Sequence, residues 1–218
     1  MSHVQNPLDI TPTLLLRAYA GGVFPMSDGG DSDEIYWVDP KTRGIFDLPR
    51  FHVSRSMARF ARNTELVIKV NSDFRGTVKG CADRPETWIN SEIFELYGTL
   101  HRLGYAHSVE VWDRAELVGG VYGVALGGAF FGESMFSRRA NASKLALIWL
   151  VARLLSGGYR LFDAQFITPH LATLGAVEVS RDDYREKLDA ALPVSANFFA
   201  MDPKTTPDQV LQRITQTS

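Results

Sequence analysis

The sequence predicts an α+β fold in which a mixed sheet with flanking helices follows a small N-terminal domain. Strand-like runs gather between residues 107 and 166, and segments with helical spacing lie before, between and after them. The composition, 45% hydrophobic and 22% charged residues, is typical of a globular protein with a sizeable core. The length of 218 residues allows one domain and a small second one. We therefore expect an N-terminal domain at 1–39 and a larger domain at 40–218.

The first elements are predicted from caps and breakers. Thr11 or Thr13 beside Pro12 can cap a helix that Gly21 and Gly22 would end. Ser54 can cap a second helix. In chain order we expect a helix at 13–20, an acidic Gly-rich loop at 27–34, short apolar runs between turns at 35–48, a helix at 53–61 and a strand at 66–70.

The later elements build the predicted sheet and its covering helices. Apolar residues at helical spacing end at Gly104, and Asn141 or Ser143 can cap a strongly apolar helix. We expect the polar tail from Pro203 to pack loosely. The expected elements are a helix at 91–103, strands at 107–112, 117–125 and 129–134, a helix at 144–155, a strand at 159–166 and a last helix from a capping box at Ser180 to about Ala191.

Two of these strands carry polar side chains inside apolar runs. Glu133 lies in the run 129–138, and Asp163 and Gln165 lie in the run 161–166. Burying a carboxylate without a partner costs several kcal/mol, so such positions indicate a built site. Asp163 and Gln165 are two residues apart and share one face of a strand. The pattern alone also fits a structural hydrogen-bonded pair, with Glu133 bound to Arg138 or Arg139.

Charge is distributed unevenly along the chain. Residues 1–40 hold six acidic residues against one basic, whereas residues 41–79 hold nine basic against three acidic. Within the basic block Arg55, Arg59 and Arg62 share one helix face, where they could bind phosphates. A solvated helix face is the alternative. The near-neutral net charge of −2 argues mildly against binding nucleic acid over the whole surface.

Several function classes are disfavoured. Cys81 is the single cysteine, which excludes an intramolecular disulfide and suits a reducing, cytoplasmic location. We recognise no signal peptide and no apolar stretch long enough for a bilayer, so we expect no membrane partner. The histidines lack metal-ligand spacing, so we expect no metal and no cofactor. We also expect a monomer.

A series of ordered blocks resembles the leucyl/phenylalanyl-tRNA–protein transferase family over about residues 9–188. The strand and helix order is also similar to that of the GCN5-related acyltransferases, which implies an acyltransferase-like mixed sheet. The matching blocks are Gly22–Pro25, Phe51–Met57, Gly80–Ala82, Thr87–Ile89, Ala106–Ser108 with Glu110–Trp112, Leu117–Val124, Gly132–Ser137 with Asn141–Lys144, and Asp163, Gln165, His170 and Leu174–Ala176.

The resemblance implies that the chain moves Leu or Phe from aminoacyl-tRNA to the N-terminal Arg or Lys of acceptor proteins, which tags them for degradation. It implies that Asp163 and Gln165 are catalytic and that Glu133 lies near the basic N-terminal residue of the acceptor. Val121, Phe130 and Met135 would line the pocket for the Leu or Phe side chain, although the pattern alone favours ordinary core packing for them. A flexible Met suits a pocket that takes both shapes.

The resemblance also implies an adenine site. Trp88 matches a family Trp that stacks on the terminal adenine of the tRNA. Its usual partner, a Trp directly after Phe-Pro, is replaced here by Met26, which can cover the ring by dispersion alone. Arg55, Arg59 and Arg62 would then contact tRNA phosphates.

The implied chemistry is aminolysis of an activated ester. The attacking α-amine has a pKa of about 7.7–8.0, so a useful fraction is neutral at pH 7. A Gln amide is a very poor base, so we expect Gln165 to orient the amine through its carbonyl oxygen. Asp163 would fix the Gln165 rotamer and stabilise developing positive charge.

Two other functions remain open at this point. A coenzyme-A-dependent N-acetyltransferase would need a glycine-rich loop before the main helix, and residues 137–142 contain no glycine. A non-catalytic adaptor for tRNA or peptide would not need the Asp163 and Gln165 pair.

Overall fold

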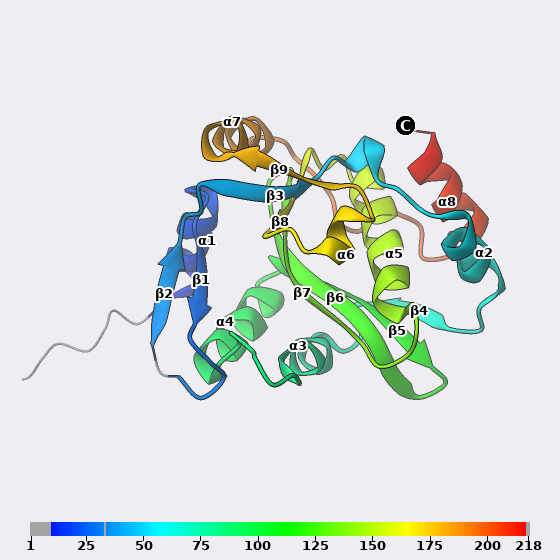
Figure 1. Cartoon of the computed structure of the whole chain (residues 1–218), viewed down its shortest axis with the longest axis horizontal. Coiled ribbons are helices and arrows are strands. Elements are labelled where there is room, and N and C mark those ends of the chain that lie inside the picture. Colours follow the sequence, from blue (N-terminus) through cyan, green and yellow to red (C-terminus); the bar gives the residue numbers. More distant parts are fainter. Residues whose placement is uncertain (1–9, 33, 217–218) are drawn as a thin grey trace, which may run out of the picture.

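A mixed seven-stranded sheet forms the centre of the described part of the molecule, with helices on both faces (Figure 1). The computed structural model describes residues 10–32 and 34–216. The strands are β1 Phe24–Ser27, β2 Ile35–Val38, β3 Thr42–Phe46, β4 Val67–Val70, β5 Ala106–Asp113, β6 Glu116–Leu126, β7 Ala129–Ser137, β8 Leu161–Gln165 and β9 Ala176–Ser180. The helices are α1 Pro12–Ala20, α2 Arg55–Asn63, α3 Phe74–Ala82, α4 Ser91–Arg102, α5 Ala142–Ser156, α6 Pro169–Ala172, α7 Arg181–Ala191 and α8 Pro207–Thr215, with a short 3₁₀ turn at Leu48–Arg50.

The strand order of the sheet is β4-β5-β6-β7-β8-β3-β9. The pairs are antiparallel except for β7 and β8, which run parallel. Parallel neighbours need a crossover, and α5 provides it between these two strands. The sheet is therefore mixed, and the expected fold class is confirmed.

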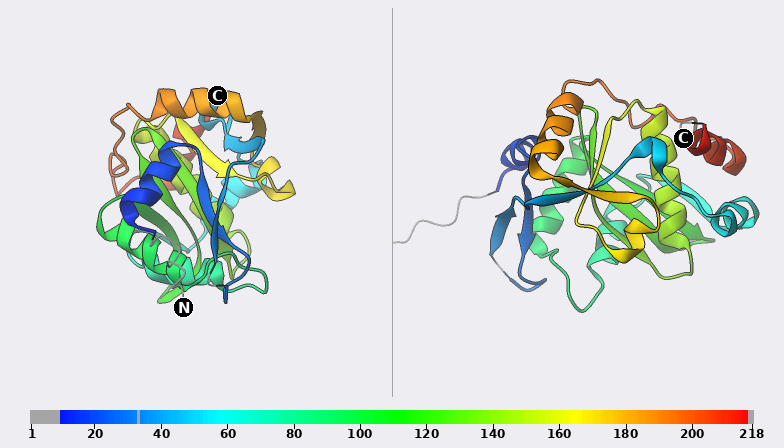
Figure 2. Two further views of the ribbon diagram at one scale, coloured as in Figure 1. Left: turned by 90° about the vertical axis from the view of Figure 1, so that its left-hand side faces the viewer. Right: turned by 45° about the horizontal axis from the view of Figure 1, so that its top comes forward.

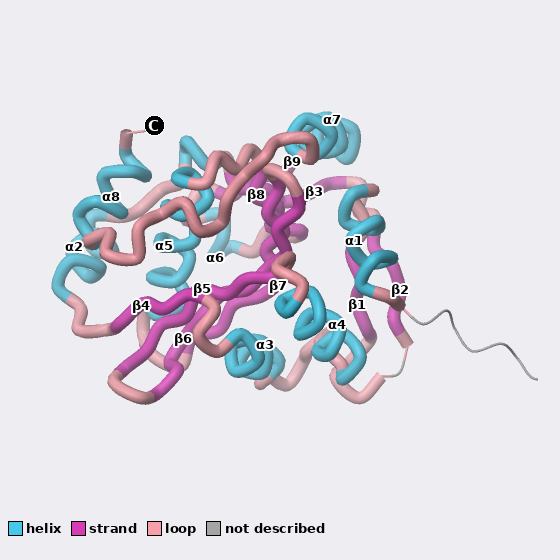
Figure 3. The backbone as a smooth tube through the Cα atoms, turned by 180° about the vertical axis from the view of Figure 1, so that it is seen from behind, coloured by secondary structure: helices cyan, strands magenta, loops and turns pink. Residues whose placement is uncertain are grey.

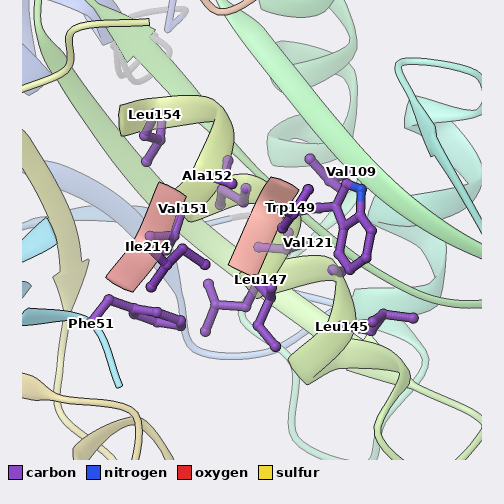
Figure 4. Packing of buried hydrophobic residues seen from close by; sticks show 14 of the residues in the cluster. Phe51, Val109, Val121, Leu145, Leu147, Trp149, Val151, Ala152, Leu154 and Ile214 are labelled. Carbon is purple, nitrogen blue, oxygen red and sulfur yellow. The ribbon is translucent and has the colours of Figure 1, made fainter. Parts of the chain in front are cut away.

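Alternation along the strands divides the core between the two faces of the sheet. Val121 and Phe130 pack in the cluster under α5, whereas their chain neighbours Tyr122 and Phe131 pack in the cluster under α3 and α4. Figure 4 shows the first cluster, in which residues of α5 surround Val109 and Val121. Figure 3 shows α3 and α4 on the opposite side of β5, β6 and β7 from α5.

The N-terminal segment forms its own two-stranded sheet but shares the main core. The hairpin of β1 and β2 is separate from the large sheet. Leu15 and Tyr19 of α1 are nevertheless fully buried in the cluster under α3 and α4. The expected domain boundary at residue 39 therefore stays a prediction. It does not separate two hydrophobic cores, because α1 packs in the main core.

Most expected elements are present, and their caps explain the boundaries. Thr11, Ser54 and Ser180 each accept a hydrogen bond from the first turn of their helices. Asn141 stands at the N-cap of α5 with a φ of 68° and makes no side-chain cap bond. The expected strand at 159–166 is shorter and spans β8 alone.

The expectation of a loose tail after Pro203 is wrong. Residues 207–215 form α8, and Val210, Leu211 and Ile214 are buried. Thr206 and Gln209 form a capping box at its start. This local signal was outweighed in the sequence analysis by the polar composition of the tail. Figure 2 shows α8 beside α2 and α5. The sequence analysis also missed α3, in which Thr and Gly occupy several helical positions.

Candidate active site

Asp163 lies on β8 with its carboxylate wholly occupied by neighbours. Arg43, on the adjacent strand β3, donates from Nε to Oδ1 at 2.9 Å and from Nη2 to Oδ2 at 2.6 Å. Tyr184 of α7 donates its hydroxyl to Oδ2 at 2.7 Å. Asp163 is 0% exposed, so these charge-assisted bonds replace its hydration. The carboxylate therefore serves as an anchor between β3, β8 and α7.

Arg43 ties this anchor to the N-terminal segment. Its guanidinium lies between the rings of Phe24 and Tyr184, at 4.4 and 4.6 Å from their centroids. Nη1 donates to the carbonyl oxygen of Gly22 at 3.1 Å. The planar, five-donor guanidinium suits this enclosed position, and Lys could not reproduce it.

Gln165 ends β8 in an unusual backbone conformation. Its φ is 61°, in the left-handed region that non-glycine residues rarely adopt. Its backbone N–H donates to Oδ1 of Asp163 at 2.8 Å. Such strain costs about 1–3 kcal/mol and persists where the surroundings hold it, often at functional sites. Asp163 thus holds the Gln165 main chain.

Glu133 of β7 holds the Gln165 side chain. Gln165 donates from Nε2 to Oε1 of Glu133 at 3.1 Å. Because an ionised carboxylate only accepts hydrogen bonds, this contact assigns the amide NH₂ to the Glu133 side. Among the described residues no group donates to Oε1 of Gln165, which stays available as an acceptor. The expectation that Asp163 fixes the Gln165 rotamer is corrected: the rotamer is held by Glu133.

Two tyrosines complete the surroundings of Glu133. Tyr19 of α1 donates to Oε1 and Tyr97 of α4 to Oε2, each at 2.7 Å. Burial raises the pKa of Glu133 more than the bonds from Tyr19, Tyr97 and Gln165 lower it, so the pKa is raised to about 7. The alternative of pairing with Arg138 or Arg139 is wrong, since those side chains bind Asp83 and Asp113.

An apolar cavity of about 80 Å³ adjoins this cluster. Val121 and Met135 face each other across β6 and β7 and both line it, as does Glu133. Phe130 does not; it is fully buried in the core and stacks with Phe198 at 5.8 Å. The other lining residues are Phe46, Gly132, Ser134, Leu147, Phe162, Ala164 and Leu171.

Larger cavities, of about 990 and 320 Å³, flank residues 200–205 and contain neither Glu133 nor Gln165. We place the candidate active site at the cavity of about 80 Å³, because Glu133 lines it and is bonded to the strained residue Gln165.

Trp88 and Met26 are half-buried in one cluster on the α4 face. The Trp88 ring meets Tyr97 edge-on with centroids 6.5 Å apart. Ser27, next to Met26, donates its hydroxyl to the Trp88 carbonyl oxygen at 2.8 Å. The structure thus brings the segments of Met26 and Trp88 together beside Tyr97, which donates a hydrogen bond to Glu133.

The arginines of α2 lie far from this cluster, since α2 and α1 occupy opposite ends of the molecule in Figures 1 and 3. Arg55 and Arg59 are exposed, and no described residue pairs with their guanidinium groups. Arg62 binds Asp208 of α8 at 2.7 Å, so the three arginines are not equivalent.

Within residues 10–32 and 34–216 no group of three or more His, Cys, Asp and Glu side chains is placed to hold a metal ion. None of the helices described there is long and apolar enough to cross a membrane.

Sequence analysis missed four residues that build the site, namely Arg43, Tyr19, Tyr97 and Tyr184. Arg43 offered one signal, a charged residue inside the short apolar strand run that begins at Thr42. The tyrosines offered none, because a Tyr at an apolar position of a helix is ordinary core.

Comparison with known proteins covers almost the whole chain. The family model described as leucyl/phenylalanyl-tRNA protein transferase matches residues 45–189, and the model of the N-terminal domain of that transferase matches residues 8–41. A curated protein of Cereibacter sphaeroides named leucyl/phenylalanyl-tRNA–protein transferase is 58% identical over 213 residues, 98% of this chain and 100% of that protein.

Two further relatives carry the same name. The protein of Dinoroseobacter shibae is 55% identical over 94% of this chain and 92% of its own length. That of Ruegeria pomeroyi is 53% identical over 97% of this chain and 100% of its own length. The family model covers more than half of the chain and the relatives cover nearly all of it, so the chain belongs to the leucyl/phenylalanyl-tRNA–protein transferase family.

Proposed function

We propose that this protein transfers Leu or Phe from aminoacyl-tRNA to the N-terminal Arg or Lys of acceptor proteins. Family membership supports the reaction class. The observation that carries the proposal is the bonded pair of Glu133 and Gln165 at the edge of an apolar cavity. The pair offers a carboxylate and an amide oxygen, and the cavity offers space for an apolar side chain.

Gln165 positions the amine in this scheme. Its Oε1 accepts a hydrogen bond from the acceptor α-amine and directs the nitrogen lone pair at the ester carbonyl. The C–N bond forms, a tetrahedral oxyanion develops, and the C–O bond to the ribose breaks. The amine proton leaves to the ribose oxygen, directly or through water. Alignment alone supplies much of the acceleration, because the ester is already activated.

Asp163 supports the reaction by positioning. Its carboxylate accepts hydrogen bonds from Arg43, Tyr184 and the backbone N–H of Gln165, so it has no free oxygen to contact the acceptor amine. Asp163 therefore contributes by keeping Gln165 in its left-handed conformation.

Glu133 gives the site its preference for basic acceptors. A carboxylate in a desolvated position binds Arg or Lys strongly, and a nearby guanidinium lowers the pKa of that carboxyl group. Acidic N-termini would meet the same charge and be repelled.

The cavity beside Met135 and Val121 receives the donor side chain. An apolar pocket separates similar side chains by only about 1–3 kcal/mol, so some use of Met-tRNA accompanies Leu and Phe. Trp88 and Met26 hold the terminal adenine, and Arg55, Arg59 and Arg62 hold tRNA phosphates. We propose that the protein acts as a cytoplasmic monomer.

The test is incubation with Phe-tRNA and short peptides that differ only in the first residue, followed by mass spectrometry. Peptides that begin with Arg or Lys should gain Phe, whereas those that begin with Asp or with an acetylated Arg should not. Gln165→Ala should lower the single-turnover rate far more than tRNA affinity, and Gln212→Ala on the exposed face of α8 is the matched control. Binding of both substrates without transfer would indicate an adaptor, and faster modification of acidic N-termini would exclude the proposal.

A further inference from the structure

A second cavity lies at the β4 edge of the sheet, away from the candidate active site. Its volume is about 320 Å³. Two strands, β5 and β6, separate β4 from β7 in the strand order. The cavity is lined by Ile68, Lys69, Val70, Trp149, Arg153, Phe199, Met201, Pro203 and Thr205. Its charged lining is thus entirely basic.

Arg153 of α5 is buried in the wall of this cavity without a counter-charge. The residue is 5% exposed. Nη1 donates to the carbonyl oxygen of Phe198 at 2.9 Å, and the guanidinium lies 5.4 Å from the Phe198 ring. Nε is enclosed and has no hydrogen-bond partner, and no carboxylate among the described residues forms an ion pair with Arg153. Burial lowers the pKa of Arg153.

Comparison with Arg43 shows that Arg153 lacks a carboxylate partner. Both guanidinium groups are buried, but Arg43 has the carboxylate of Asp163 as a partner. A buried charge without a partner costs several kcal/mol. Its neighbour His107, which stacks on Phe198 at 4.1 Å, has a pKa lowered to about 4 by burial, His101 and Arg153, so at neutral pH it carries no charge and cannot balance that of Arg153. Water could hydrate Arg153 but could not neutralise it.

We infer that this cavity binds a small oxyanion, a carboxylate or phosphate group, at Arg153. Lys69 of β4 also touches the cavity, but its ammonium lies over the Trp112 ring at 4.4 Å, on the opposite face of the sheet from Ile68 and Val70. Arg153 therefore supplies the positive charge of the site. Trp149 and the exposed ring of Phe199 offer apolar surface for the rest of the ligand. The volume lies at the lower end of the range for small-molecule sites.

A free small anion fits better than a nucleic-acid phosphate. Arg153 is recessed beneath the surface, and a phosphate on a stiff RNA helix would have to enter the cavity to reach it. The inference does not depend on the proposed transfer activity, because the residues differ and the test needs no tRNA.

The test measures binding of three probes at constant ionic strength: inorganic phosphate, benzoate and neutral benzamide. Trp149 reports binding by its fluorescence, and Trp149→Phe identifies its share of the signal. Phosphate and benzoate should change the fluorescence saturably and raise Tm by a few degrees, whereas benzamide should do neither. No response to either anion would overturn the inference.

Variants locate the site. Arg153→Met should abolish both responses, and Arg153→Lys should retain part of them. Lys69→Met, which removes an ammonium on the other face of the sheet, should respond like wild type. Arg160→Met, at an exposed arginine outside the cavity, should respond like wild type. Equal Tm shifts in wild type and Arg153→Met would show a general salt effect and refute the site. If Arg153→Met does not fold, Arg153→Lys decides: a weakened response supports the site, and a response equal to that of wild type refutes it. Displacement of benzoate by tRNA would instead assign the cavity to a nucleic-acid phosphate.

Discussion

Asp163 and Gln165 lie on one strand end but depend on different partners. Asp163 is locked by Arg43 and Tyr184, whereas Gln165 donates to Glu133. In the proposed reaction the two residues therefore act by separate routes, Asp163 through the backbone of β8 and Gln165 through its side-chain amide.

The buried pair of Arg43 and Asp163 should be strongly coupled. Arg43→Met leaves Asp163 buried without a counter-charge and should lower the free energy of unfolding by about 3–5 kcal/mol, measured by urea denaturation. Arg43→Met combined with Asp163→Asn should cost less than the sum of the single variants. Arg75→Met, which breaks the exposed pair with Glu95, is the control and should cost far less, because solvent screens an exposed ion pair. Similar losses in Arg43→Met and Arg75→Met would contradict this account.

Glu133 should make stability depend on pH. Its folded pKa of about 7 exceeds the ordinary value of 4.5, so the folded protein binds the proton more tightly between these values. Its contribution is present in full below pH 4.5 and is lost as pH rises to about 7, by about 3 kcal/mol. The difference in unfolding free energy between wild type and Glu133→Gln should fall across this window.

A matched control comes from Glu95, whose pKa is lowered by the hydrogen bond from Arg75. Glu95→Gln leaves Glu133 in place, so the stability of this variant should still decline with pH across the window, as that of wild type does. A difference between wild type and Glu133→Gln that stays constant from pH 4.5 to 7 would show that Glu133 does not titrate there.

At the scale of elements, α8 is part of the core. It packs on α5 and α2, and Ile214 is 1% exposed. Ile214→Ala should lower the free energy of unfolding by about 2–5 kcal/mol. Gln212→Ala on the exposed face of the same helix should have little effect. A negligible loss for Ile214→Ala in chemical denaturation would mean that α8 is not docked in solution.

At the scale of the whole molecule, α2, the proposed phosphate-binding helix, and α1, which contributes Tyr19 to the proposed active site, lie at opposite ends. Arg55→Ala and Arg59→Ala should each weaken binding of full-length tRNA and reduce the slope of log K against log salt by about one unit. They should leave transfer from a minimal aminoacyl-adenosine donor unchanged. Arg62→Ala, whose side chain is engaged by Asp208, should have a smaller effect on binding. Equal losses of activity with full-length tRNA and with the minimal donor would mean that these arginines act in folding or in the catalytic pocket rather than in binding distant phosphates.

The sequence by itself determined the elements whose signals are local. Alternation along β5, β6 and β7, the apolar run of α5 and the caps at Thr11, Ser54 and Ser180 each depend on residues a few positions apart. The same kind of signal singled out Glu133, Asp163 and Gln165, because a polar residue in an apolar run is visible without knowledge of its neighbours.

Only the tertiary structure decided the partners of these residues. Arg43 reaches Asp163 from 120 positions away, and Tyr19 reaches Glu133 from 114. Strand order and helix docking follow from packing summed over the whole molecule, which no local window contains. For the same reason Phe130 and Met135, both apolar on β7, were indistinguishable by pattern, although one lies in the core and the other lines the cavity beside Glu133.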